Sequence, residues 1–313
     1  MRSVARLAMR GPYHAASLAA AFLLAAPVVA FLLVPSGALI ALATLRHGAA
    51  SGLRVLVTAA VIAAGVRFVL SGDVAPQLLL GGLTWVPAWS MALVLGQRRQ
   101  QVYPLLVAAA LVAVYALAMR LLVGDVAAYW SAHLAPLFEL LARDAGARFT
   151  PQQVAYVAGQ LHLWSLVGIQ VLLSGMILLA RWWQAVLYNP GGFGSEFREL
   201  ALPRAALFAL GVAAALLLLD RAGTAGLAGA GDACVILMVL FAFQGLAVVH
   251  YRAKVRSLAS GWLAGMYVLL VLMPQLAGPL LASTGVADSV VDWRHLRRPR
   301  HPALPPTDED AQP

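Results

Sequence analysis

Polar side chains inside long apolar runs are the first residues to consider in this sequence. His162, Gln170 and Gln244 each lie within such a run. An ionised side chain costs roughly 2.5–3.5 kcal/mol at the centre of a membrane helix, so polar groups there normally face a cavity or another helix. Trp85 and Trp89 lie four residues apart, on one face of a predicted helix, where they would wall an apolar pocket. These five residues are candidates for a small-solute pocket, and interhelical hydrogen bonding or packing is the alternative.

A second group of candidates lies in one connection, residues 181–203. Tryptophans anchor the end of the preceding apolar run, a Gly-rich stretch predicts a tight turn, and a short amphipathic stretch follows. Aromatic side chains on such a segment offer anchors that a partner protein would bury, and an ordered connector without a partner is the alternative. The partner-docking candidates, chosen for charge, aromatic character or turn geometry, are Arg181, Trp182, Asn189, Pro190, Gly191, Gly192, Phe193, Glu196 and Phe197.

Catalytic and metal-binding motifs are missing from the sequence. The Gly-rich segment 189–195 lacks the lysine of a nucleotide-binding loop, and Phe197 stands where a dinucleotide motif needs its third glycine. The histidines form no metal-ligand motif, and Cys234 is the single cysteine. The apolar runs contain no paired carboxylates, so an intramembrane enzyme acting on lipid-linked substrates is the least favoured alternative. We expect no enzyme activity, no cofactor and no metal site.

The composition indicates a membrane protein. Of 313 residues, 62% are hydrophobic and only 11% are charged, and the mean hydropathy is +0.82. Soluble chains carry about 25% charged residues, so a soluble protein is excluded. The net charge of +9 comes mostly from arginines between the apolar runs, which membrane topology explains without nucleic acid. The predicted fold class is all-α: a polytopic transmembrane helical bundle.

The apolar runs predict about nine membrane elements, because a bilayer about 30 Å thick requires about 20 apolar residues per helix. One of them, 36–45, is too short to cross alone and is expected to be a broken or buried helix. The first run is expected to be retained as a span, with cleavage as a signal peptide as the alternative. The nine elements are 15–34, 36–45, 53–70, 76–96, 102–123, 159–182, 205–219, 233–250 and 258–274, the last with an irregular extension to about residue 281.

Arginine and lysine near the ends of the runs predict the orientation, with the N-terminus in the cytoplasm. Alternation then places the basic connections after residues 45, 96, 182 and 250 inside. The predicted organisation is a basic cytoplasmic N-terminus, 1–14, and one transmembrane domain, 15–291, with an outer loop 124–158 and an inner loop 183–204. A basic, then acidic and Pro-rich disordered tail follows at 292–313.

The arginines of this tail conflict with an odd number of crossings, which would place the tail outside. Three explanations remain open at this point: a short return of the chain at 274–291, a second element that does not cross, or a failure of the charge bias.

The outer loop contains signals of its own. Apolar residues between Leu134 and Leu141 recur at helical spacing among charged residues, which predicts an amphipathic helix lying on the outer interface or capping the bundle. Thr150, Pro151 and Gln153 predict a helix start with a capping box.

Several of these segments together carry a family resemblance. The residues that carry it are the run 181–197, Leu45, Arg46, Gly48, Phe243, Gln244, Gly245, Gly285, Asp288, Asp292, Trp293 and Arg294. In these residues the chain resembles the YybS-like family of bacterial inner-membrane proteins, over about residues 15–295. That family is distantly similar to the substrate-capture subunits of energy-coupling-factor transporters.

The resemblance implies a helical bundle in the bacterial cytoplasmic membrane. Such a bundle binds a small solute from outside and relies on a separate membrane coupling subunit with cytoplasmic ATPases. The sequence departs from those capture subunits in having more spans than their usual six. The function expected is a transporter-like solute-capture or accessory subunit energised by a partner, and the alternative is a membrane scaffold for an envelope-associated complex.

Overall fold

The computed structural model describes residues 2–145, 149–222 and 229–294, and these residues form helices joined by short turns. The helices of the N-terminal half are α1 (Arg2–Ala8), α2 (Pro12–Ala25), the 3-10 turn η1 (Ala30–Leu32), α3 (Leu33–His47), α4 (Ala49–Ser71), α5 (Ala75–Arg98), α6 (Val102–Ala118), the π turn η2 (Met119–Val123) and α7 (Val126–Ala145). The others are α8 (Pro151–Tyr188), α9 (Gly192–Arg198), α10 (Arg204–Arg221), α11 (Ala230–Val255), α12 (Ser260–Leu272) and α13 (Pro274–Val291).

Six helical segments among the described residues are long and apolar enough to cross a membrane, so the expected count of about nine is not confirmed. The predicted first span, 15–34, is wrong as a single helix, because α2 ends at Ala25 and a turn precedes η1. α12 has only 13 residues, and α10 has charged residues at both ends. The six segments are Ala30–His47, Ala49–Ser71, Ala75–Arg98, Val102–Val123, Pro151–Tyr188 and Ala230–Val255.

Helix α3 forms the centre of the N-terminal half. All residues from Pro35 to Thr44 are buried, and the helix contacts α2, α4, α5 and α8. The Oγ of Ser36 donates to the carbonyl oxygen of Ala19 (2.7 Å) and accepts from Nε1 of Trp85 (2.9 Å), which ties α3 to α2 and α5. The element expected at 36–45 is therefore buried, as predicted, but it is the middle of a longer unbroken helix.

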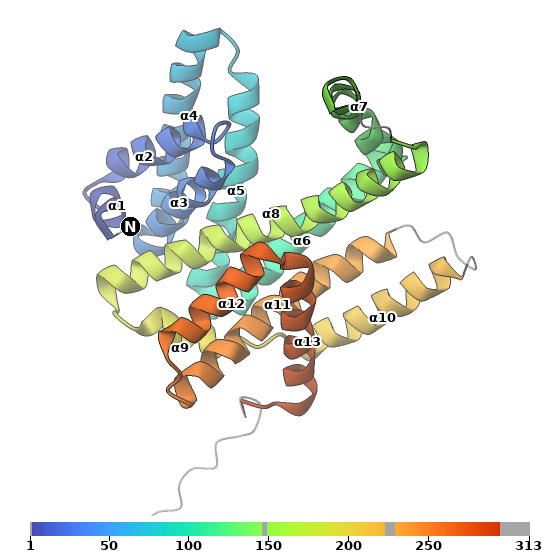
Figure 1. Ribbon diagram of the computed structural model, residues 1–313. Coiled ribbons are helices and arrows are strands. Elements are labelled where there is room, and N and C mark those ends of the chain that lie inside the picture. The colour runs from blue at the N-terminus through green and yellow to red at the C-terminus, as the bar shows by residue number, and fades with distance from the viewer. Residues whose placement is uncertain (1, 146–148, 223–228, 295–313) are drawn as a thin grey trace, which may run out of the picture.

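Helix α8 runs between the two halves of the molecule, with α4 and α5 on one side and α10 to α13 on the other (Figure 1). Its 38 residues are about 57 Å long at 1.5 Å per residue, so α8 extends beyond a bilayer. The predicted capping box at Thr150 is confirmed, and α8 begins there, earlier than the predicted start at 159. It also continues to Tyr188, and α9 follows, so most of the predicted inner loop 183–204 is helical.

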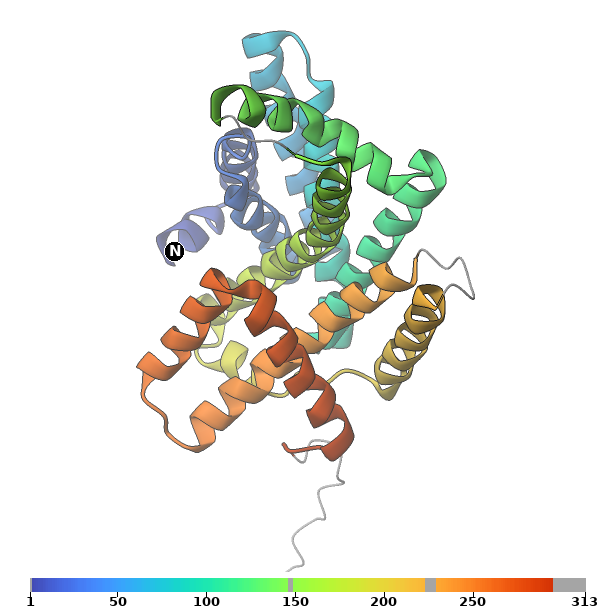
Figure 2. The same cartoon turned by 45° about the vertical axis from the view of Figure 1, so that its right-hand side comes forward.

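The amphipathic helix predicted in the outer loop is α7, which contacts α8. At the other end of the chain, α12 and α13 form a hairpin with its bend at Met273, and α13 crosses α11 (Figure 2). Arg294, just beyond α13, hydrogen-bonds to the carbonyl oxygens of Arg198 and Leu200. The chain after α13 therefore starts on the same side as the 189–203 segment, which favours the short return among the three explanations. Residues 295–313 of the predicted disordered tail lie outside the described residues.

Three basic junctions meet on one face of the molecule. Nε2 of Gln184 lies 3.5 Å from the carbonyl oxygen of Leu45, and the guanidinium of Arg46 lies 4.4 Å from the centre of the Tyr188 ring. Nε2 of Gln101 donates to Glu196 (3.3 Å). We call this the basic face: the α3–α4, α5–α6 and α8–α10 junctions. The contacts agree with the alternation expected from the charges, while the placement of this face in the cytoplasm stays a prediction.

Candidate functional site

Helices α11 and α13 touch backbone to backbone where they cross. A Cβ atom at Gly245 would overlap the carbonyl oxygen of Leu281, and a Cβ atom at Gly285 would overlap that of Phe241. Only glycine allows such an approach at both positions. Because the two helices meet at this point, they separate from each other toward the start of α13.

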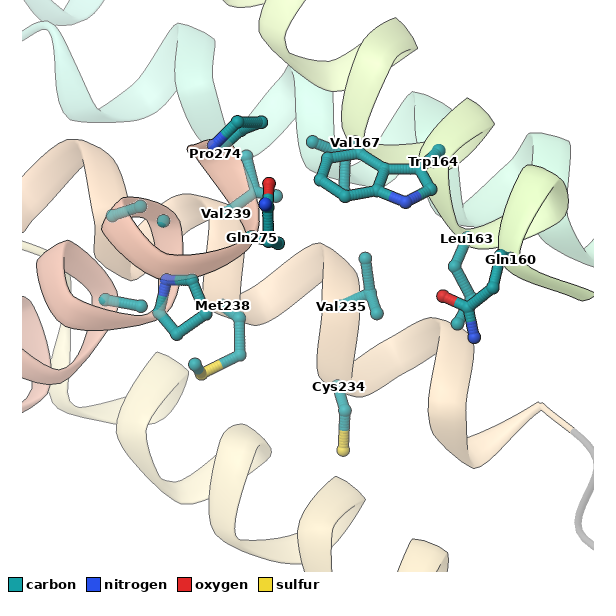
Figure 3. A pocket seen from close by; sticks show the side chains of 14 residues that line it. Gln160, Leu163, Trp164, Val167, Cys234, Val235, Met238, Val239, Pro274 and Gln275 are labelled. Carbon is teal, nitrogen blue, oxygen red and sulfur yellow. The ribbon is translucent and has the colours of Figure 1, made fainter. Parts of the chain in front are cut away.

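A cavity of about 370 Å³ lies in that space, between α8, α11 and α13. Figure 3 shows Trp164 and Gln160 of α8, Met238 of α11, and Pro274 and Gln275 of α13 around it. The Trp164 side of the cavity is open, since this residue is 42% exposed. The described lining residues include no charged side chain; they are Gln160, Leu163, Trp164, Val167, Cys234, Val235, Met238, Val239, Ala242, Pro274, Gln275, Gly278, Pro279 and Ala282. An apolar wall with a few polar groups is typical of a small-molecule site.

A charged cluster lies at the start of α11, two residues before Cys234 of the cavity lining. Asp232 is buried in the first turn of α11, where a carboxylate interacts favourably with the helix dipole. Nε of Arg120 donates to Oδ2 of Asp232 (2.8 Å) from the π turn η2. Nε2 of His162 lies 3.3 Å from Oδ1 of Asp232, but the two are not aligned as a hydrogen bond. The charges of Arg120 and Asp232 therefore compensate each other.

A second buried cluster lies beyond the Gly245–Gly285 crossing. Nε2 of Gln244 donates to Oδ2 of Asp288 (2.8 Å) and to Oγ of Ser289 (3.0 Å), and Oε1 accepts from the backbone N–H of Leu202 (2.9 Å). Arg294 donates to both carboxylate oxygens of Asp288, at 3.2 and 2.7 Å. With the contacts of Arg294 to the 198–200 carbonyl oxygens, this cluster joins α11, α13 and the 199–203 segment.

The partner-docking candidates lie around the α8–α9 turn, where all except the buried Phe197 are exposed or half-buried. Nε of Arg181 donates to Oε2 of Glu196 (2.9 Å), and its Nη2 contacts Oε1 of the same carboxylate. Phe193 stacks on the buried Phe197, with ring centres 5.9 Å apart. Gly191 has a φ of +91°, which favours glycine. Asn189, Pro190 and Gly191 are exposed, while Trp182 and Gly192 are half-buried.

A polar cavity of about 380 Å³ adjoins this surface on the basic face. Its polar side chains come from Arg99, Arg181, Gln184, Tyr188, Asn189 and Glu196. The α8–α9 segment is thus held by an ion pair and an aromatic stack, and it presents both apolar and polar groups at its surface.

The five solute-pocket candidates lie in separate places, and none belongs to the described lining of the α8–α11–α13 cavity. Nε1 of Trp89 donates to the Ala49 carbonyl oxygen (3.1 Å). Nε2 of Gln170 donates to the Ile236 carbonyl oxygen (3.1 Å), while its Oε1 accepts from no group in the described part of the chain. His162 faces Asp232, and Gln244 binds Asp288. Trp85 binds Ser36, as described for α3.

The cavity's own polar residues, Gln160 and Gln275, were missed by sequence reasoning. A signal did exist for the first, because Gln160 and Trp164 are spaced four apart and share a helix face. The Arg120–Asp232 ion pair also had a signal in the sequence, because the two residues are opposite charges at the ends of two apolar runs.

Comparison with known protein families gives a match over part of the chain. A family described as "Predicted membrane protein (DUF2232)" matches residues 188–289. This range runs from the end of α8 almost to the end of α13, so it includes α11, the Gly245–Gly285 crossing and the Gln244–Asp288 contact. No curated protein and no solved structure gives a significant match. The match and the apolar helices together identify a multi-pass helical membrane protein, with a segment similar to this family.

Proposed function

We propose that the protein is a transporter-like accessory subunit that captures a small apolar solute and is energised by a separate partner. The observation that carries this proposal is the cavity of about 370 Å³ between α8, α11 and α13, which the Gly245–Gly285 crossing closes at one end. Its volume lies within the range of about 300–1,000 Å³ that is usual for small-molecule sites.

The lining defines the class of solute. Trp164, Met238 and Pro274 provide apolar and aromatic surface, while the amides of Gln160 and Gln275 can hydrogen-bond a neutral polar group. The described lining has no charge to balance a charged solute, and the nearby Asp232 already binds Arg120. A neutral, ring-bearing molecule with one or two polar groups fits this chemistry best.

The energy source in this proposal is a membrane coupling subunit with cytoplasmic ATPases, in a bacterial cytoplasmic membrane. The sequence has no nucleotide-binding loop, and arginines cluster on the basic face, which the charge rule places in the cytoplasm. The surface around the α8–α9 turn would bind that partner.

A physical connection between the two sites supports this assignment. The Gln244–Asp288–Arg294 cluster joins the α11 and α13 walls of the cavity to the 199–203 segment, which directly follows α9. A partner that moves α9 would therefore pull on the two helices whose crossing closes the cavity.

The test is solute binding by the purified full-length protein. We expect neutral aromatic solutes from a metabolite panel to raise its thermal unfolding temperature. Gly278→Phe should abolish this shift, because residue 278 lines the cavity, whereas Gly265→Phe on α12 should preserve it as a matched control. A panel without any shift, together with no ATPase recovered from native membranes, contradicts the proposal.

The scaffold for an envelope-associated complex is the second candidate. The observation in its favour is that Gln244 and Gln170 both make interhelical hydrogen bonds, which stabilise a bundle and bind no solute. A scaffold needs the surface around the α8–α9 turn but not the cavity. Its phenotype should therefore survive Gly278→Phe and be lost when Gly191, Gly192 and Phe193 are replaced together.

A further inference from the structure

A separate groove of about 750 Å³ lies among the α1–α2 turn, the end of α3 and the beginning of α4. Arg10, His47 and Arg54 contribute basic side chains to it from three different parts of the chain. Tyr13 and Ser51 add hydroxyl groups, and no carboxylate belongs to the described lining. The groove therefore attracts an anion.

The groove lies on the basic face, at the end of a candidate span. His47 is adjacent to Arg46, whose guanidinium stacks over Tyr188 of α8, and Arg54 lies in the second turn of the α4 span. Leu53 and Val57 line the same groove and are 44% and 52% exposed. Basic groups at the end of the span thus lie next to an uncovered apolar wall along it.

We infer that this groove binds the headgroup of an anionic phospholipid, with the acyl chains against Leu53 and Val57. Guanidinium groups bind phosphate oxygens through paired, charge-assisted hydrogen bonds. Basic pockets next to membrane helices on the cytoplasmic side are suited to anionic headgroups. The groove's apolar wall favours a lipid over free phosphate, which would leave Leu53 and Val57 uncovered.

The binding test uses the full-length protein in a neutral detergent, mixed with equal amounts of phosphatidylglycerol and phosphatidylcholine. Native mass spectrometry measures which lipid stays bound. We expect the wild type to retain phosphatidylglycerol preferentially, and the double variant Arg10→Gln/Arg54→Gln to lose this preference by roughly tenfold. Arg10→Lys/Arg54→Lys should keep most of it, because the charge remains.

A matched control removes two arginines outside the groove, in Arg67→Gln/Arg143→Gln, and should retain the lipid preference of the wild type. Equal retention of both lipids by the wild type would overturn the inference, as would an unchanged preference in the glutamine variant. Displacement of phosphatidylglycerol by excess inorganic phosphate would also overturn it, by assigning the groove to free phosphate. Size-exclusion chromatography checks that each variant is folded. If Arg10→Gln/Arg54→Gln does not fold, the single variant Arg54→Gln is measured in its place.

Discussion

The guanidinium of Arg294 forms two hydrogen bonds with the carboxylate of Asp288, and both side chains are buried. Asp288 also accepts from Gln244, and Arg294 also donates to the Leu200 carbonyl oxygen. This one pair therefore connects the α11–α13 crossing with the segment that follows α9. It gives Arg294, just after α13, a structural role that its charge alone does not reveal.

Asp288→Asn should destabilise the protein by about 3–5 kcal/mol, because it leaves the buried Arg294 charge without its counter-charge. Unfolding of the purified protein by heat or by denaturing detergent measures this loss. Glu139→Gln, on the exposed face of α7, is the control and should change little. Asp288→Leu, Arg294→Met and the variant with both changes form a double-mutant cycle, in which the double change should cost less stability than the sum of the two single changes. A pair without energetic coupling would show simple additivity instead.

Gly245→Ala should destabilise the protein by about 1–3 kcal/mol or more, because the added Cβ would overlap the Leu281 carbonyl oxygen. Gly285→Ala should behave in the same way. In the control Gly265→Ala, the new methyl group meets no atom within 4 Å, so the higher helix propensity of alanine should leave stability unchanged or slightly raised. Equal melting temperatures for the three variants would argue against the close crossing.

Local signals in the sequence predicted local structure well. The capping box at Thr150 and the amphipathic α7 depend on residues a few positions apart, and both were found. The break in the 15–34 run also has a local signal, Pro27 just after the end of α2, which the prediction from apolar length did not use.

The candidate site was predicted less well, because it depends on contacts between distant helices. Gln160 and Gln275 meet at one cavity only because α13 crosses α11 at Gly245, a geometry that apolar periodicity does not encode. Conversely, Gln244 is a polar residue within an apolar run, as expected of a pocket residue, yet its amide hydrogen-bonds to Asp288 and to the backbone of Leu202. Polarity inside a span indicates a partner but does not tell whether that partner is solute or protein.

Gly278 offers a position for a direct probe of the cavity, because it belongs to the lining and a Cβ atom there meets no atom within 4 Å. The single cysteine, Cys234, also belongs to the lining, but its thiol points away from Trp164 and Gln275 (Figure 3), so it is first replaced by serine. In Cys234→Ser/Gly278→Cys, uncharged N-ethylmaleimide should modify the new thiol several-fold faster than a sulfonate reagent, since the described lining is apolar and uncharged. Mass spectrometry of the intact protein measures the rates, with Cys234→Ser alone as the blank. Faster modification by the charged reagent would indicate an aqueous environment and exclude an apolar solute site.

Phe193 tests the surface around the α8–α9 turn. Its ring stacks on Phe197 while remaining half-exposed, so Phe193→Ala removes contact area for a partner and leaves the Arg181–Glu196 ion pair in place. We expect recovery of the partner from mild-detergent membranes to fall several-fold, with a change of no more than about 1 kcal/mol in stability.

Phe208→Ala, on the exposed side of α10, is the matched control and should recover the partner normally. If the two variants recover the same proteins in the same amounts, the docking surface lies elsewhere. A loss of an ATPase or its membrane subunit with Phe193→Ala alone would favour the energised accessory subunit, whereas a loss of envelope-assembly proteins would favour the scaffold.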